Sequence, residues 1–531
     1  MMWMFACFKR PARPVAGLVG VALCCLATVV AAESDGTAFA TAIDRALTAR
    51  CLNNPQTSVS ILSVPDGTPV YERNPHTALM PASIQKIVTT AAALHYLGPE
   101  FRFITELRYR GKRQGDTLVG DLILRGSGDP FLNTEELRQI ARQLSNSGIR
   151  QVTGQLIADV HIFDEYDRAP AWDEVRTQKL YDAKLGALSL NLNSIAVHMQ
   201  AGAELNDPLR VWLEPAPAYI HLNNQARTGK AGRNSLRVQR STTASNEAQI
   251  AVLGNFPVNG GTQVAMLNVD DPTRYSIESF RAFLSEAGIQ VQGDTQISRQ
   301  KIEGTLLHSH SSPPLSLILK ELNTYSNNFI AEQIIKTIAA RYTGTPATHA
   351  AGLGLVTQFL STQGIDVQAL SLLDGSGLSR DNRFSARAMT DLLLHMYPRF
   401  DVGPDFMASL RVMGAQGVHS KRLINSPARG LVRAKTGTLN RVSTLAGYVP
   451  NQQGQLFAFA FFLNNNDCGY RGADDIEDSL IKAIYQLGTP ITAPVRVQTS
   501  QLAPAFTATA PPPVQPAPLA AAPAAAPVDQ P

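Results

Sequence analysis

The sequence predicts a mixed α/β fold in which a long β-rich insertion separates two helix-containing regions. Helical periodicity over residues 36–50 and a run of good helix formers from Ala82 onward mark the first region. From Phe101 the pattern changes to short alternating strands, and helical periodicity returns at residues 316–322. The expected limits are 33–97 and 296–488 for a discontinuous α/β domain, and 98–295 for the insertion.

Individual elements follow from local patterns along the chain. Residues 57–64 alternate as a strand that Pro65-Asp66-Gly67 turns, and Gly111–Asp116 turns a second hairpin. The other expected strands share apolar alternation: 103–109, 118–124, 152–158, 209–213, 250–253, 262–269, 445–449 and 455–463. The other expected helices share apolar residues at helical spacing: 134–144, 276–287, 386–396 and 474–487.

Composition places the chain among globular proteins. Of its 531 residues, 44% are apolar and 17% are charged, which is enough apolar material for a substantial core. The formal net charge is +4, and the basic residues are scattered rather than gathered in one stretch. We therefore expect no nucleic-acid partner.

The two ends of the chain differ in composition from the rest. Three basic residues precede a long apolar run, which predicts an export signal over residues 1–32 and a periplasmic protein. An uncleaved anchor is the alternative, so we expect membrane contact to be at most peripheral or N-terminal. Residues 489–531 are rich in Pro and Ala, a composition typical of a disordered tail.

Ser83 and Lys86 form a Ser-x-x-Lys pair at the start of the helix expected after Pro81. Residues three apart on a helix lie on one face, so the hydroxyl and the amine should be neighbours. No other charged residue lies between Arg73 and Glu100, and desolvation on an apolar helix lowers the pKa of a lysine. Lys86 is therefore a candidate base for activating the serine.

Two further short motifs follow in the chain. Ser326-Asn327-Asn328 gives Ser-x-Asn, and residues 435–438 give the only Lys-Thr-Gly in the sequence, extended by a threonine. Other Ser-x-x-Lys copies begin at Ser298 and Ser479, but the first lies in a polar run and the second has no such partners downstream. The pair at Ser83 is therefore the one we interpret as functional.

Ser-x-x-Lys, Ser-x-Asn and Lys-Thr-Gly in this order are the three motifs of the penicillin-recognising serine enzymes. The chain resembles the D-alanyl-D-alanine carboxypeptidase/endopeptidase family of low-molecular-mass class C penicillin-binding proteins, in which a long insertion separates the first two motifs. The resemblance covers about residues 36–490, and the central motif reads Ser-Asn-Asn where the family often has Ser-Asp-Asn. Further matching stretches are Pro81–Lys86, Gly128-Asp129-Pro130, Asp374–Ser379 and Lys435–Thr438.

The resemblance implies a fold, an activity and a set of partners. The fold would be a transpeptidase-like catalytic domain, with an antiparallel sheet flanked by helices. The activity would be that of a serine DD-peptidase, a D-Ala-D-Ala carboxypeptidase and a D-Ala-diaminopimelate endopeptidase, acting on peptidoglycan peptides. β-Lactams would acylate and inhibit the enzyme, and no metal or other cofactor is expected.

The resemblance also assigns roles to residues. Ser83 would form the acyl-enzyme, with Lys86 or Lys435 taking the first proton. The backbone N–H groups of Ser83 and Thr438 would form the oxyanion hole. The implied catalytic residues are Ser83, Lys86, Ser326, Asn328 and Lys435, and the implied substrate-binding residues are Thr436, Gly437 and Thr438.

Three other functions were weighed against this interpretation. A class A β-lactamase needs a glutamate base between the second and third motifs, and between residues 329 and 434 the only glutamate is Glu332. A class C β-lactamase or esterase uses Tyr-x-Asn, which Tyr325-Ser326-Asn327 satisfies, but those enzymes lack the long insertion. A non-catalytic peptidoglycan-binding scaffold would be expected to have eroded motifs, whereas all three are intact here.

A disulfide between Cys51 and Cys468 is the last expectation. These are the two cysteines outside the leader, and exported proteins form disulfides. In the family that the sequence resembles, the first and last strands of the catalytic sheet are antiparallel neighbours. That pairing would bring the start of strand 57–64, and with it Cys51, to the edge where Cys468 follows strand 455–463.

Overall fold

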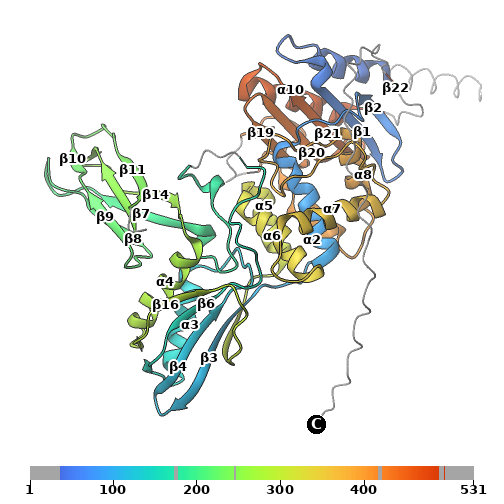
Figure 1. The fold of residues 1–531 in the computed structure, drawn as a ribbon. Helices are drawn as coiled ribbons and strands as arrows, with labels where there is room; N and C mark the ends of the chain where they lie inside the picture. The colour runs from blue at the N-terminus through green and yellow to red at the C-terminus, as the bar shows by residue number, and fades with distance from the viewer. Residues whose placement is uncertain (1–35, 173–176, 244–246, 416–420, 489–494, 497–531) are drawn as a thin grey trace, which may run out of the picture. The chain divides into compact units, whose positions relative to one another are not determined.

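The computed structural model describes residues 36–172, 177–243, 247–415, 421–488 and 495–496 (Figure 1). The predicted leader, residues 1–32, lies outside the described residues, and so does the predicted tail apart from residues 495–496. Among the residues that are described, no helix combines the length and the apolar composition needed to cross a membrane.

A seven-stranded sheet forms the frame of the α/β region and is mostly antiparallel. Its first strand along the chain pairs with its last long strand, from Thr57 opposite Leu463 to Val64 opposite Leu456, as the family resemblance implied. Only the short β22 pairs in parallel, with β2. The strands in spatial order are β18 (Arg411–Val412), β19 (Arg433–Leu439), β20 (Val442–Pro450), β21 (Leu456–Asn464), β1 (Thr57–Val64), β2 (Pro69–Arg73) and β22 (Val495–Arg496).

Both faces of this sheet are covered, which explains why nearly every residue of its central strands β20, β21 and β1 is buried. On one face, Phe457, Phe459 and Phe461 of β21 join a core with the helix of residues 36–47 and with α10 (Gly469–Gln486). On the other face, alternate residues of the same strand, including Phe462, join a second core with α8 (Ala386–Met396).

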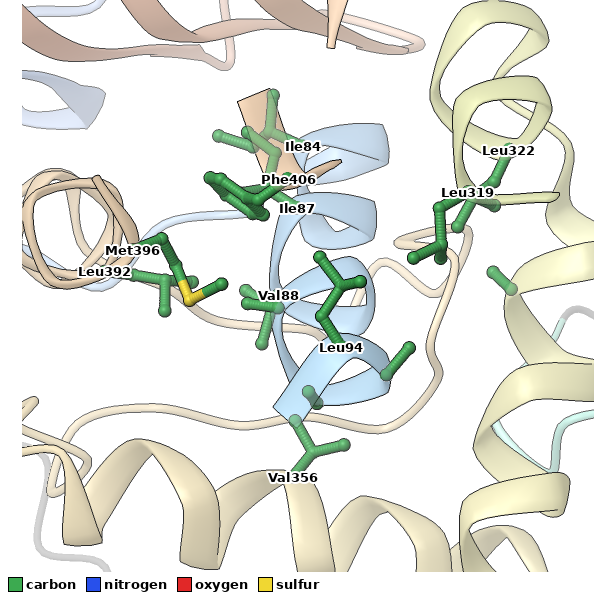
Figure 2. Packing of buried hydrophobic residues seen from close by; sticks show 14 of the residues in the cluster. Ile84, Ile87, Val88, Leu94, Leu319, Leu322, Val356, Leu392, Met396 and Phe406 are labelled. Carbon is green, nitrogen blue, oxygen red and sulfur yellow. The ribbon is translucent and has the colours of Figure 1, made fainter. Parts of the chain in front are cut away.

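The helix α2 (Gln85–Leu97) is enclosed by other helices. Every residue from Gln85 to Leu94 is buried, so this part of the helix has no solvent-facing side. Figure 2 shows Ile87, Val88 and Leu94 packed among apolar side chains of its neighbours. The surrounding helices are α5 (Leu315–Tyr325), α6 (Asn328–Tyr342), α7 (His349–Thr362), α8 and α9 (Gly403–Ser409). A polar side chain on this buried part of α2, such as that of Lys86, is therefore placed in the protein interior.

The residues expected as an insertion form further sheets and most of a separate apolar core, which also includes Ala339 and Ala347. The main sheet of the insertion contains β15 (Gln290–Val291), β5 (Gln151–Val152), β4 (Thr117–Arg125), β3 (Ile104–Gln114) and β17 (Thr305–Ser311), with β6 (Leu156–Asp159) between β4 and β16 (Thr295–Ser298). The helices α3 (Thr134–Asn146) and α4 (Pro272–Glu286) also contribute to this core. Smaller sheets are formed by β14 (Thr262–Asn268), β7 (Ser194–Gln200) and β8 (Arg210–Glu214), by β11 (Arg237–Thr242), β12 (Ala248–Leu253) and β9 (Ile220–Asn224), and by β10 (Arg227–Gly229) with β13 (Asn255–Pro257).

The chain enters and leaves the insertion at adjacent points. The N–H of Phe103 donates to Oγ of Ser312 at 3.0 Å, and the N–H of Ser312 donates to the carbonyl of Phe103 at 3.0 Å. The strand β17 pairs with β3, so the sheet of the insertion continues to Ser311, past the limit of residue 295 expected from the sequence. The strand β17 was not predicted, because its residues are exposed or half-buried and its sequence lacks the apolar alternation of a buried strand.

Some elements differ from the sequence expectations for local reasons. The helix expected at 276–287 begins at Pro272, because Asp271 caps it and proline suits its first turn. The strand expected over 152–158 is divided into β5 and β6. The bounds of α6 and α7 were not predicted from the sequence. Every residue of α6 from Asn328 to Ala339 is buried, so its sequence shows no polar face.

A disulfide joins Cys51 to Cys468, with an S–S distance of 2.11 Å and a sequence separation of 417 residues. The N–H of Asp467 also donates to the carbonyl of Cys51 at 2.8 Å. The bridge lies where β1 begins and β21 ends, at the edge implied by their antiparallel pairing. It ties the segment after the first helix to the start of α10.

Replacing both cysteines by serine is expected to lower the free energy of unfolding, because the bridge closes a very long loop. Chain entropy sets an upper value on the order of 5 kcal/mol for a loop of this size. Denaturant titration of the double variant beside the oxidised wild type measures the difference. Alkylation of both thiols in unreduced, exported wild-type protein would show that the bridge does not form.

Candidate active site

Ser83 lies in a tight turn (Ala82–Ile84) that leads directly into α2. Ala82 has a φ of 46°, in the left-handed region that alanine rarely adopts. The carbonyl of Ala82 lies so close to Gly377 that a Cβ atom there would come within 1.8 Å of it. Gly377, with a φ of +79°, thus allows a close approach that supports the strained turn.

Lys86 is fully buried and contacts three oxygen atoms. Its Nζ lies 3.0 Å from Oγ of Ser83, 2.7 Å from Oδ1 of Asn328 and 2.6 Å from the carbonyl oxygen of Ser376. Burial lowers the pKa of Lys86 to about 8, against the opposite effect of two nearby carboxylates. An amine with this pKa is partly neutral near pH 8 and can accept a proton from the serine.

The second motif forms the connection between α5 and α6, and each of its three residues has a different structural role. Ser326 ends α5 in a left-handed conformation with a φ of 56°. Asn327 caps α6 by accepting a hydrogen bond from the N–H of Ile330, and Asn328 begins α6 and reaches Lys86. Asp and Asn are comparable N-caps, which explains why either residue suits the middle position.

Lys435 of β19 brings the third motif to the second. Its Nζ lies 2.8 Å from Oγ of Ser326 and 2.7 Å from the carbonyl of Thr436. The side chain is buried, and burial, Lys86 and Arg411 lower the pKa of Lys435 well below its ordinary value. A lysine with a lowered pKa that contacts the Ser326 hydroxyl can pass a proton.

Gly437 allows β19 to pack against the serine turn. A Cβ atom at this position would meet Oγ1 of Thr444 at 2.2 Å and the backbone nitrogen of Ser83 at 2.8 Å. The glycine is therefore required for close approach between β19 and Ser83. Along the strand, Thr436 is half-buried and Thr438 is exposed.

The positions of the second-motif residues bear on the alternative Tyr-x-Asn frame. Ser326 contacts Lys435, and Asn328 contacts Lys86. The side chain of Tyr325 is largely exposed, and that of Asn327 is engaged as a helix cap. The geometry therefore favours the Ser-x-Asn frame.

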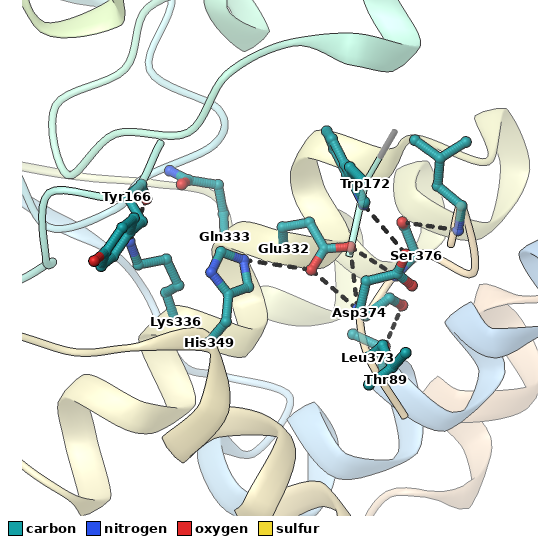
Figure 3. A network of polar contacts seen from close by, with 12 residues as sticks. Thr89, Tyr166, Trp172, Glu332, Gln333, Lys336, His349, Leu373, Asp374 and Ser376 are labelled. Atoms are coloured by element: carbon teal, nitrogen blue, oxygen red, sulfur yellow. Dashed lines mark hydrogen bonds and ion pairs between the residues drawn. The ribbon is translucent and has the colours of Figure 1, made fainter. Parts of the chain in front are cut away.

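Two buried carboxylates beside the site were not identified from the sequence. Glu332 of α6 and Asp374 flank the turn that carries the Ser376 carbonyl (Figure 3). Oε1 of Glu332 accepts hydrogen bonds from the N–H groups of Gly375 and Ser376, and Oε2 accepts a second one from Gly375. Both of its oxygens are occupied by backbone, so Glu332 is not placed as the base of a class A β-lactamase. The stretch Asp374–Ser379 matches the family pattern, but the sequence assigns no role to its aspartate.

The insertion also contributes contacts that the sequence did not indicate. Nε1 of Trp172 donates to Oδ2 of Asp374 at 3.2 Å, and the carbonyl of Tyr181 accepts from Nδ2 of Asn328 at 3.0 Å. A lone tryptophan and a backbone carbonyl carry no local signal in a sequence. Across the described part of the chain, no three His, Cys, Asp or Glu side chains gather as a metal site.

Comparison with known proteins agrees with the resemblance drawn from the motifs. The family model described as the D-Ala-D-Ala carboxypeptidase 3 (S13) family matches residues 39–486. The D-alanyl-D-alanine carboxypeptidase of an Actinomadura species is 34% identical over 441 residues, covering 80% of each chain. The D-alanyl-D-alanine carboxypeptidase DacB of Haemophilus influenzae is 29% identical over 404 residues, covering 75% of this chain and 83% of that one.

Solved structures show the same fold. The crystal structure of penicillin binding protein 4 from Haemophilus influenzae matches with a TM-score of 0.71 at 24% identity, covering 83% of this chain and 98% of that chain. A second structure of that protein, in complex with a β-lactam, matches with a TM-score of 0.67 at 25% identity, covering 84% and 98%. The predicted mixed α/β, penicillin-binding fold is confirmed. On the extent of the family match and the identity to its members, the chain belongs to the D-Ala-D-Ala carboxypeptidase 3 (S13) family, the serine-type D-alanyl-D-alanine carboxypeptidases.

Proposed function

We propose that this chain removes the terminal D-Ala from peptidoglycan stem peptides through an acyl-enzyme on Ser83. The observation that carries the assignment is the 3.0 Å contact between Oγ of Ser83 and the fully buried amine of Lys86. A hydroxyl beside a neutral amine is activated for attack on a carbonyl carbon. The family relationship supplies the substrate class.

In the first step, Oγ of Ser83 bonds to the carbonyl carbon of the penultimate D-Ala. The hydroxyl proton passes to Nζ of Lys86, which lies 3.0 Å from this hydroxyl, whereas Lys435 contacts the hydroxyl of Ser326. The N–H groups of Ser83 and Thr438 are the candidates to hold the oxyanion, a role worth about 3–4 kcal/mol per donor in comparable enzymes.

In the second step, the carbon–nitrogen bond breaks and the amine of the leaving D-Ala takes a proton. Ser326 and Lys435, which contact each other at 2.8 Å, are the candidates to relay the proton held by Lys86 to this amine, so Lys86 is neutral again when the amine leaves. Thr436 and Thr438 of β19 are the candidates to bind the terminal carboxylate. Water then hydrolyses the ester and releases the shortened peptide, which regenerates the serine.

Cleavage of D-Ala-diaminopimelate cross-links needs no further chemistry. The same acyl-enzyme forms, and only the leaving amine differs, so we propose endopeptidase activity as well. β-Lactams would acylate Ser83 by the same attack. In support, a member of this fold has been solved with a β-lactam bound.

We further propose that the protein works in the periplasm. The leader-like composition of residues 1–32 and the disulfide between Cys51 and Cys468 both suit an exported, oxidising environment. Membrane contact, if it occurs, would be peripheral or through the N-terminal segment.

Digestion of purified muropeptides tests the proposed function. The wild type should remove D-Ala from monomeric pentapeptides and split cross-linked dimers, and Ser83→Ala should do neither. Ser298→Ala changes the serine of an unrelated Ser-x-x-Lys copy and should behave as the wild type. Mass spectrometry should place a penicillin adduct on the peptide that contains residue 83. Activity retained in Ser83→Ala would refute the assignment of the nucleophile.

Replacing Lys86 by Arg should slow penicillin acylation about 100-fold or more, because a guanidinium stays protonated and cannot serve as a base. Lys301→Arg, at an exposed lysine of another Ser-x-x-Lys copy, is the matched control and should not change the rate. Stopped-flow measurement with a fluorescent penicillin gives both rates. A Lys86→Arg rate within about tenfold of wild type would mean that another group activates the serine.

A further inference from the structure

Glu332 is a buried carboxylate that fixes a backbone turn without touching Ser83. The N–H of Gly375 donates to Glu332 at 3.0 and 3.1 Å, and the N–H of Ser376 donates at 2.8 Å. On the other side of this turn, the carbonyl of Gly375 accepts from Oγ1 of Thr89, and the carbonyl of Ser376 accepts from Nζ of Lys86, each at 2.6 Å. Hydrogen bonds from α6 and α2 thus hold the turn on two sides (Figure 3).

Asp374 holds the peptide group that follows. The N–H of Gly377 donates to its Oδ1 at 2.6 Å, and the N–H of Ser379 donates to its Oδ2 at 2.6 Å. The Gly377 N–H and the Ser376 carbonyl belong to the same peptide group. Glu332 and Asp374 therefore fix the two consecutive peptide groups that set the direction of the Ser376 carbonyl.

The direction of this carbonyl matters because of the hydrogen-bonding capacity of a neutral amine. Neutral Lys86 has two N–H donors and one lone pair. A carbonyl oxygen and the Oδ1 of Asn328 can only accept, so they engage the two donors. The lone pair is then left for the third neighbour, Oγ of Ser83.

We propose that Glu332 is a positioning residue for the peptidase reaction: it holds the Gly375–Ser376 backbone so that the Ser376 carbonyl directs the lone pair of Lys86 toward Ser83. The inference rests on the function proposed above. When it is ionised, Glu332 has a second effect, since its charge raises the pKa of Lys86 and so opposes the effect of burial. Burial and Asp374 raise the pKa of Glu332 itself to about 8, so Glu332 and Lys86 titrate over the same pH range.

Three charged or titratable groups face Lys86. Glu332 comes from α6, Asp374 from the turn and Lys435 from β19. The two carboxylates raise the pKa of Lys86, whereas Lys86 and Lys435 disfavour each other's charge. Removing the charge of Glu332 alone should therefore make Lys86 less basic.

Glu332 itself faces few other charges. Nε2 of His349, on α7, lies 3.6 Å from its Oε2, but burial and Lys336 lower the pKa of His349 to about 3. The imidazole is therefore neutral at the pH of the reaction. Lys336 is engaged with Asp164, with its Nζ 2.5 Å from Oδ1. The charge of Glu332 thus acts mainly on Lys86 and Asp374.

The pH dependence of penicillin acylation tests this role. In the wild type the rate should rise as the pH rises through about 8, because only neutral Lys86 can accept the serine proton. In Glu332→Gln the midpoint should move down, by up to about 1 pH unit because Glu332 is only partly ionised near pH 8, and the plateau rate should fall about tenfold or more. Thr89→Val removes a hydrogen bond to the same turn without changing a charge, so its midpoint should match the wild type.

A merely structural role for Glu332 would reduce the amount of active enzyme without moving the midpoint. A folded Glu332→Gln variant with the wild-type midpoint would therefore overturn the inference. If that variant does not fold, Glu332→Asp decides, since it keeps the charge but shortens the side chain. It should show the wild-type midpoint and a lower plateau, and a wild-type plateau would overturn the inference. Absence of acylation in the wild type itself would refute the proposed function instead.

Discussion

The burial of the Lys86 amine is the constraint on which the rest of the site depends. Lowering its pKa from 10.5 to about 8 corresponds to about 3 kcal/mol of lost preference for the charged form. At the position of Lys86, α2 has no solvent-facing side, so the amine is removed from water. The oxygen atoms of Ser83, Asn328 and Ser376 satisfy the amine without supplying a direct ion pair. A salt bridge would keep Lys86 protonated, whereas these neutral partners leave it able to exchange a proton.

The insertion begins and ends at one place in the α/β region, and it also contacts the helix that carries Asn328. Its entry and exit are joined by hydrogen bonds between Phe103 and Ser312, so about two hundred residues occupy a single connection of the α/β region. The inserted segment then returns contacts to α6, where Nε2 of Gln333 donates to the carbonyls of Gly128 and Gly186. The helix α6, which carries Asn328, is thereby held by the insertion through Gln333 and by α2 through Lys86.

The parts of the site that could be predicted from the sequence are those with fixed spacing or a characteristic residue type. Ser83 and Lys86 follow from helical spacing, and the short Lys-Thr-Gly motif is rare enough to be noticed. Glu332, Asp374 and Trp172 could not be predicted, because their roles come from contacts between segments far apart in the chain. The end of the insertion was also missed, since β17 is polar and its membership of the sheet depends on pairing with β3. Local sequence patterns do not indicate pairing between strands that are far apart in the chain.

Direct titration of Lys86 is the measurement that tests this account most closely. Nuclear magnetic resonance of protein labelled at the lysine Cε carbon, with Lys86→Arg used to assign the signal, reports the protonation of this one side chain. The account predicts a midpoint near 8, because burial disfavours the ammonium form. A midpoint near the ordinary lysine value of 10.5 would show that Lys86 stays charged at neutral pH and would contradict its role as the base.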